Sequence, residues 1–150
     1  MEFDPTAFFG FEVLGGWLGG VGGGIGGFFL DFFLCLGSLS DDVGLAGLGC
    51  LVGGGGLGYL IGTPVGSTLG VSIVSALNGV QGNLLLGFVG SVAGEGAGIL
   101  TVATLAGIGF DSDLGGAAYI AGVPLVSALG ATLGYNVDAK FKASQAPAMP

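Results

Sequence analysis

The sequence predicts an all-α membrane protein of about four transmembrane helices packed in one tight bundle. Of its 150 residues, 51% are hydrophobic and only 8% are charged, and the mean hydropathy is +0.93. A soluble domain usually has about 25% charged residues, so this chain has too little polar surface to cover a water-exposed globule. Polar breaks divide it into four apolar stretches, each longer than the about 20 residues that cross a bilayer as a helix. These stretches are residues 5–36, 43–77, 84–110 and 114–137.

Residues that cap helices precede each stretch. Asp4 and Pro5 form a pair typical of a helix start, because aspartate accepts bonds from the first turn and proline fits the first helical position. Capping side chains also occur in residues 40–42, at Asn83 and in residues 111–113. Hydropathy and capping therefore place the helix boundaries in the same regions.

The chain is predicted to form one domain. Residues 1–138 make a glycine-rich transmembrane helical domain, and residues 139–150 make a short polar C-terminal tail. The first stretch is longer than one crossing, so residues 3–13 are predicted to lie at the membrane interface. Pro64 and Pro124 are predicted to kink or break their helices. No repeat is close enough to indicate internal duplication.

The glycines recur at helical spacing. A residue every fourth position lies on one side of a helix, and glycine there leaves a groove in which a second backbone can approach closely. Each span is therefore predicted to be a glycine-zipper helix. The predicted packing positions are Gly15, Gly19, Gly23, Gly27, Gly54, Gly58, Gly62, Gly66, Gly70, Gly90, Gly94, Gly98, Gly122, Gly130 and Gly134.

A four-residue period is also even, so a β structure is the alternative. Across residues 57–77 the odd positions are mostly large and the even positions mostly small, as in a barrel strand. The first stretch breaks this alternation at adjacent bulky pairs such as Trp17 and Leu18 while keeping helical spacing. A glycine-rich β-barrel or a self-assembling β filament stays the alternative to the helical bundle.

Two acidic residues are candidates for an intramembrane polar site. Glu95 lies in the middle of the third stretch, where a charge is costly and indicates proton carriage, ion binding or a polar helix contact. A structural, hydrogen-bonded glutamate is the simpler interpretation. Asp31 lies near the end of the first apolar stretch, either at the headgroup boundary or as a second polar point beside Glu95.

Composition excludes several functions. With ten acidic residues, two lysines and no arginine, the chain cannot assemble a cationic face for nucleic acid. Without histidine it lacks the usual general base and metal ligand, so neither enzyme activity nor a cofactor is predicted. The glycine runs lack the further residues of nucleotide-binding motifs. Cys35 and Cys50 are interpreted as two buried thiols, with a disulfide between them as the alternative.

The location and orientation are only weakly marked. Lys140 and Lys142 directly follow the last stretch, which favours a cytoplasmic C-terminus, and four spans then return the N-terminus to the same side. The predicted location is a membrane of a bacterial cell envelope, and the inner and the outer membrane are both alternatives.

Two resemblances bear on function. Residues 57–66 and 129–136 resemble a loose group of small glycine-rich bacterial envelope proteins of unknown function, which implies an envelope location and no activity. The chain is also similar to the glycine-rich proteolipid subunits of rotary ATPases, whose intramembrane carboxylate would correspond to Glu95, although their basic and polar hairpin loop is not found here.

The leading prediction is a structural role. The chain would be an accessory subunit that packs by small-residue helix faces, with the lipid bilayer and other membrane subunits or copies of itself as partners. The alternative is a small ion- or proton-conducting protein that uses Glu95.

Overall fold

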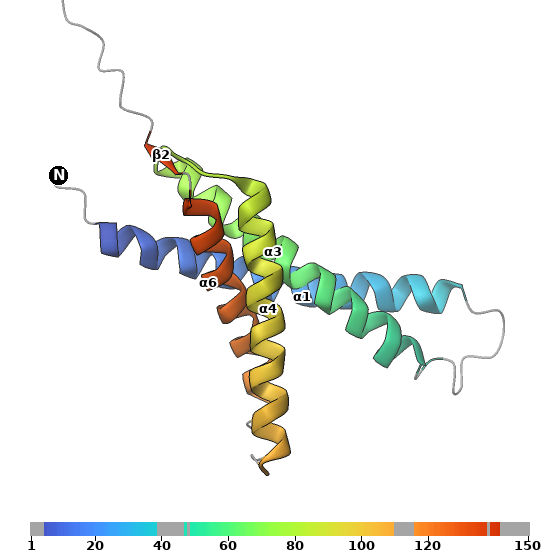
Figure 1. The fold of residues 1–150 in the computed structure, drawn as a ribbon. Coiled ribbons are helices and arrows are strands. Elements are labelled where there is room, and N and C mark those ends of the chain that lie inside the picture. The colour runs from blue at the N-terminus through green and yellow to red at the C-terminus, as the bar shows by residue number, and fades with distance from the viewer. Residues whose placement is uncertain (1–4, 39–46, 48, 110–115, 138, 142–150) are drawn as a thin grey trace, which may run out of the picture.

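A computed structural model describes residues 5–38, 47, 49–109, 116–137 and 139–141, and these are almost entirely helical (Figure 1). The helical elements are α1 (Pro5–Gly37), the π-helix η1 (Cys50–Gly54), α3 (Gly55–Leu77), α4 (Leu84–Gly107), the π-helix η2 (Ala118–Gly122) and α6 (Val123–Asn136). They form four helices long and apolar enough to cross a membrane: Phe8–Gly37, Cys50–Leu77, Leu84–Gly107 and Ala118–Asn136. The predicted all-α membrane fold is confirmed.

Strand structure is minor in the described part of the chain. It consists of β1 (Val80–Gln81) and β2 (Lys140–Phe141), which pair antiparallel. The β alternative is therefore wrong, because α3 covers the stretch with barrel-like alternation and satisfies its backbone internally.

Helix starts follow the predicted chemistry where they are described. The helix α1 begins at Pro5. The Asn83 side-chain oxygen accepts hydrogen bonds from the backbone N–H groups of Leu85 and Leu86 at 3.1 and 3.2 Å, which confirms the cap of α4. Asp4 and the predicted breaks at 40–42 and 111–113 lie outside the described residues.

The helices α1 and α3 form one antiparallel hairpin held at glycines. A Cβ added to Gly19 or Gly23 would lie within 3.0 Å of the backbone of Gly66 or Gly62, a separation that real Cβ atoms do not show. Gly15 faces Gly70 and Gly27 faces Gly58 in the same way, although the nearest atom to Gly15 belongs to the Val74 side chain. At these positions any side chain would hold the two backbones apart, so glycine is required there by proximity.

The helices α4 and α6 form a second antiparallel hairpin with similar contacts. Gly90 meets Gly130, Gly94 meets the backbone of Val126, and Gly134 meets the backbone of Leu86. Gly98 contacts Val123 less closely, and Gly54 in the first hairpin contacts Cys35 and Asp31. Gly122 does not take part, because nothing lies within 4 Å of a Cβ built on it.

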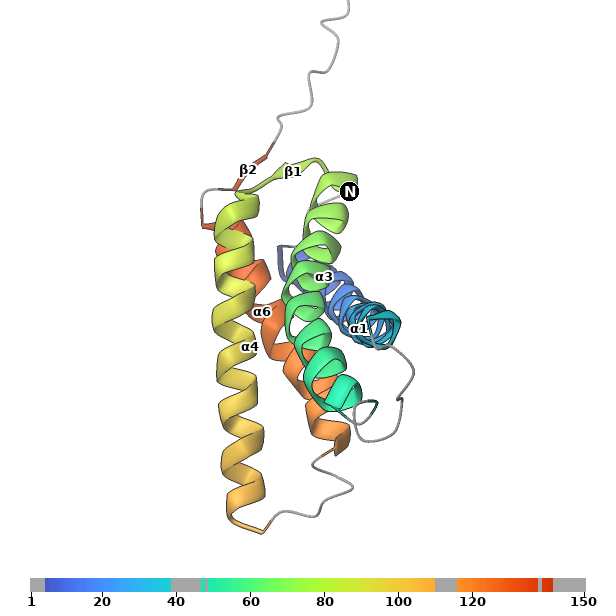
Figure 2. The ribbon, with the colours of Figure 1, turned by 90° about the vertical axis from the view of Figure 1, so that its right-hand side faces the viewer.

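The two hairpins cross each other steeply and diverge toward their loops (Figure 1). They converge where β1 pairs with β2, and α3 and α6 lie between α1 and α4 along the line of contact (Figures 1 and 2). The first hairpin is the longer, since α1 has 33 residues and α4 has 24.

The N-terminal part of α1 packs against the bundle on one face, and the interfacial position of residues 3–13 stays a prediction, with residues 3 and 4 outside the described part of the chain. The helix is continuous from Pro5, and Glu12 within it is completely buried against other helices. This face of α1 is therefore part of the bundle. Hydropathy could not separate a buried face from an interfacial one.

The two prolines behave differently from one another. The helix α3 continues through Pro64 without a break. Pro124 lies at the start of α6, directly after the π-helix η2, so the helix changes type there. The predicted break at Pro64 is wrong, because α3 is helical on both sides of this residue.

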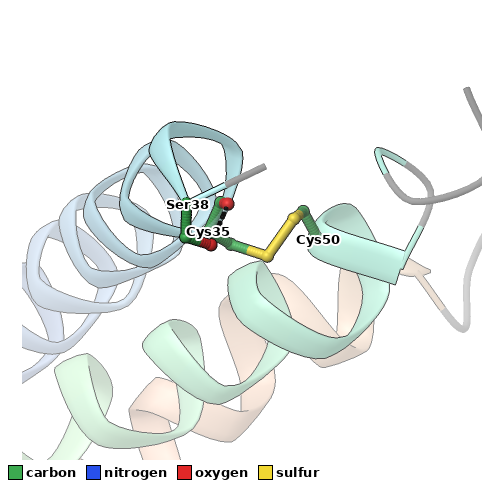
Figure 3. Close-up of a disulfide and its surroundings, with 3 residues drawn as sticks. All are labelled: Cys35, Ser38 and Cys50. Carbon is green, nitrogen blue, oxygen red and sulfur yellow. Dashed lines mark hydrogen bonds between the residues drawn. A yellow bond between two sulfur atoms is a disulfide. The ribbon is translucent and has the colours of Figure 1, made fainter. Parts of the chain in front are cut away.

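Cys35 and Cys50 form a disulfide, so the interpretation as two free thiols is wrong (Figure 3). Their Cα atoms are 5.5 Å apart, and the bond joins the end of α1 to η1. The Ser38 hydroxyl donates a hydrogen bond to the Cys35 carbonyl at 2.6 Å and closes the same end of α1. The disulfide therefore fastens the loop end of the first hairpin.

Candidate functional site

The interior of the bundle is more polar than its outer surface. Large apolar side chains such as Leu18, Leu85 and Leu133 are exposed, as lipid-facing residues are, and among the described residues the contacting cluster of buried apolar side chains is small, with Val71, Ala131 and Tyr135 as its members. The buried polar residues are Glu12, Thr63, Ser67, Thr68, Ser75, Ser91, Glu95, Ser127 and Thr132. Polar groups buried inside a membrane bundle are costly and point to function.

Glu95 lies at the middle of α4 and faces the bundle interior. Its side chain is only 5% exposed, and its Oε1 atom has no hydrogen-bond partner among the described residues. No cationic side chain in the described part of the chain pairs with it. A carboxyl oxygen left unpaired at such a position is an unused site for a proton or another ligand.

A serine pair lies one helical turn from Glu95. The Ser91 and Ser127 hydroxyl oxygens are 2.7 Å apart and connect α4 to α6. The Ser91 hydroxyl can instead donate its proton to the Pro64 carbonyl at 3.2 Å, and the Ser127 hydroxyl can donate to the Ser91 carbonyl at 3.1 Å. These hydroxyls connect three helices beside Glu95, and each can exchange donor and acceptor roles.

Two stacked tyrosines connect α3 to η2. The Tyr59 and Tyr119 ring centroids are 5.4 Å apart, and the two rings are stacked. The Tyr59 hydroxyl is 3.3 Å from the carbonyl oxygens of both Tyr119 and Ile120, to which it can donate. Pro124 has no N–H to donate to the Ile120 carbonyl one turn earlier, so Tyr59 supplies the missing donor.

Two further hydroxyls face the glycine surface of α1. Thr63 Oγ1 and Ser67 Oγ on α3 are buried and have no partner by hydrogen-bond geometry among the described residues. They lie under Gly24 and Gly20, where a Cβ would be within 3.0 Å of each hydroxyl oxygen. The glycines of α1 therefore leave room for polar atoms in the core as well as for the backbone of α3.

Glu12 forms a second buried carboxyl site, at the end of the bundle where β1 and β2 pair. Its Oε1 accepts from the Ser75 hydroxyl, and its Oε2 accepts from the Asn136 amide at 2.6 Å. It therefore joins α1, α3 and α6. Its spacing of four residues from Gly16, in step with Gly20, was the signal that this glutamate faces the bundle.

Asp31 does not belong to either site. It is partly exposed near the disulfide end of the first hairpin, beside Gly54 and Gly58. No hydrogen bond among the described residues joins it to Glu95. The proposed pairing of Asp31 with Glu95 as two polar points of one site is therefore not found.

The described residues offer no evident metal centre, since no three His, Cys, Asp or Glu side chains gather among them. What they offer is one unpaired carboxyl oxygen on the same helix as Ser91 and one turn from it, where Ser91 pairs with Ser127, and such groups can hold and exchange protons. No protein-family model, no curated protein and no solved structure matches this chain, so the inferences about its function depend on this geometry.

Proposed function

We propose that this protein carries protons across a membrane, with Glu95 as the group that takes up and releases them. The observation that carries the proposal is the buried, unpartnered Oε1 atom of Glu95 at mid-helix. A metal cation would require several oxygens converging on one point, whereas a proton requires one acceptor and hydroxyls to relay it. The Glu95 site contains one acceptor oxygen with hydroxyl groups on the neighbouring helical turn, which suits a proton.

A polar face along α3 supports a route through the bundle. Tyr59, Thr63, Ser67 and Ser75 follow one another at multiples of four residues on the buried side of this helix, with Val71 as the apolar member of the series. Sixteen residues of helix cover about 24 Å, most of the thickness of a hydrocarbon core. Glu12 closes the series beside Ser75, so carboxyl groups occur at mid-bundle and at one end.

Substitution of Glu95 by glutamine tests this function. Protein is reconstituted into liposomes that contain a pH-sensitive dye, and a potassium gradient with valinomycin drives proton uptake. The Glu95→Gln variant cannot ionise, so we expect uptake to fall at least about tenfold, to the rate of empty liposomes. Asp31→Asn is the matched control, since it removes a carboxylate outside the site and should retain the rate of the unmodified protein. Unmodified protein that is no faster than empty liposomes, or full activity in Glu95→Gln, would refute the proposal.

A structural subunit is the second candidate. Most zipper glycines are occupied within the chain, but Ala93, Gly96 and Ala97 form an exposed small-residue face on α4, and nothing lies within 4 Å of a Cβ on Gly96. Such a face suits packing against a second copy or another subunit of an envelope assembly. If it does so, Gly96→Leu lowers the mass of the particle extracted in mild detergent, with Gly22→Leu on α1 as the control.

The disulfide indicates an orientation. Disulfides persist in oxidising compartments, so the loop ends of both hairpins should face the oxidising side and the C-terminus the cytoplasm. This agrees with the lysines after α6. In sealed right-side-out vesicles, a membrane-impermeant maleimide should label Ile108→Cys at once and Ala139→Cys only after permeabilisation. The native cysteines are unreactive in the disulfide, and the reverse pattern would invert the orientation.

A further inference from the structure

The two hairpins contain the same sequence motif in their second helices. Residues 59–70 read YLIGTPVGSTLG and residues 119–130 read YIAGVPLVSALG, so six of twelve positions are identical. The identical pairs are Tyr59 and Tyr119, Gly62 and Gly122, Pro64 and Pro124, Ser67 and Ser127, Leu69 and Leu129, and Gly70 and Gly130. The second member of each pair lies sixty residues after the first.

The strand pairing has two-fold symmetry under the same shift. Val80 pairs with Phe141, and Gln81 pairs with Lys140. A shift of sixty residues relates Val80 to Lys140 and Gln81 to Phe141. Each residue thus pairs with the counterpart of its neighbour, the reciprocal arrangement that a two-fold axis produces.

The first helices of the hairpins correspond as well, with a shift of seventy-five residues. Gly15 meets Gly70 in one hairpin, and Gly90 meets Gly130 in the other. This shift differs from that of the second helices because the first hairpin has a longer loop end. The difference concealed the repeat from inspection of the sequence, which indicated no duplication.

Two apolar grooves provide an independent check of the correspondence. One, of about 420 Å³, lies between α3 and α4, and the other, of about 400 Å³, lies between α6 and α1. Their linings correspond: Val65, Leu69, Leu84 and Phe88 in the first, and Leu125, Leu129, Phe9 and Val13 in the second. Sequence, strand register and surface shape therefore give the same two-fold relation.

The axis passes beside the Glu95 site. In the proposed orientation both hairpin loops face the same side of the membrane, which would set the axis along the membrane normal, and the counterparts Tyr59 and Tyr119 stack on each other. Membrane transporters built from such repeats hold their substrate at the repeat interface, near helices interrupted at corresponding positions. Here the corresponding residues are Pro64 and Pro124, of which Pro124 lies where the helix changes type while α3 continues through Pro64. The counterpart of Glu95 is Gly20, so the interface contains one carboxyl of this kind rather than two.

We propose that the chain is a duplicated helical hairpin whose halves move against each other about this axis to open the Glu95 site, with the Tyr59 hydroxyl as one of the latches between them. The role of the opening in proton carriage rests on the proposed function. Tyr59 in the first half bonds to the Tyr119 and Ile120 carbonyls of the second. The Tyr119 hydroxyl makes no corresponding hydrogen bond within the described residues. The latch is therefore one-sided, and its symmetry counterpart is a matched control.

The latch is tested by the exposure of the site to water. In a Ser67→Cys background, a small water-soluble thiol reagent in the bilayer-reconstituted protein reports how often the interface opens. Tyr59→Phe should raise the labelling rate about fivefold, the factor that one neutral hydrogen bond provides, and Tyr119→Phe should leave it unchanged. Equal rates in the two variants, or no increase in Tyr59→Phe, would overturn the latch.

Proton uptake, measured on the same variants without the cysteine, separates this proposal from the proposed function. Tyr59→Phe should raise uptake, and addition of Glu95→Gln should abolish the increase. Faster labelling without any proton uptake retains the latch and refutes proton carriage. Uptake that depends on Glu95, with labelling unchanged by Tyr59→Phe, retains proton carriage and refutes the latch.

Discussion

Replacement of Gly66 by leucine is expected to prevent α1 and α3 from closing into their hairpin. A Cβ at Gly66 would lie within 3.0 Å of the Gly19 backbone, which cannot rotate away as a side chain can. Overpacking of a core typically costs about 1–3 kcal/mol, and a clash between backbones should exceed that range. The free energy of unfolding in mixed micelles with increasing SDS measures the loss. Trp17, the single tryptophan, reports it because its Nε1 donates to the Ala121 carbonyl of the other hairpin at 2.9 Å.

Gly56→Leu is the matched control for this prediction. Gly56 lies on the same helix, but nothing lies within 4 Å of a Cβ built there. The same substitution should therefore change the free energy of unfolding by less than about 1 kcal/mol, since the added side chain meets lipid. Equal destabilisation by the two substitutions would show that helix propensity, and not proximity of the backbones, determines where glycine is needed.

Replacement of Glu12 by alanine is expected to produce the second large loss of stability. The change removes both acceptors of the Ser75 hydroxyl and the Asn136 amide and leaves these donors without Glu12 at the junction of three helices. A buried polar group without a partner costs about 1–3 kcal/mol, so the two together should lower the free energy of unfolding by about 2–6 kcal/mol. The same SDS titration measures it.

Glu12→Gln distinguishes the hydrogen bonds from the bulk of the side chain. Glutamine fills the same space and retains one acceptor oxygen, so it should lose clearly less stability than alanine. If Glu12→Ala were as stable as Glu12→Gln, the hydrogen bonds at this junction would contribute nothing to the bundle.

The sequence predicted the helices well because few backbone conformations are stable in lipid. A backbone in hydrocarbon must satisfy its own polar groups, so each long apolar stretch became a helix, and glycines at four-residue spacing became contacts such as Gly23 with Gly62. Asn83 capped α4 where local chemistry alone decides the boundary. These features depend on residues close together in the chain.

The features that the sequence did not predict depend on residues that are far apart in the chain. Glu12 does not stand out in the sequence, because hydropathy does not show that its partners are Ser75 and Asn136, which arrive from two other helices. The disulfide required α1 and η1 to be brought together by the hairpin. Glu95 was found from its position in an apolar stretch, but the tyrosine pair beside it became visible only when the two hairpins met.

The most direct test of this architecture is the contact between Tyr59 and Tyr119 in a bilayer. The chain has only three tyrosines, so the protein with ring-labelled ¹³C-tyrosine gives a simple solid-state NMR spectrum, which single Tyr→Phe variants assign. With labelled chains diluted in unlabelled ones, a through-space cross-peak should join Tyr59 to Tyr119, whose ring centroids are 5.4 Å apart. A helical protein in lipid that lacked this cross-peak would contradict the arrangement of the two hairpins around Glu95.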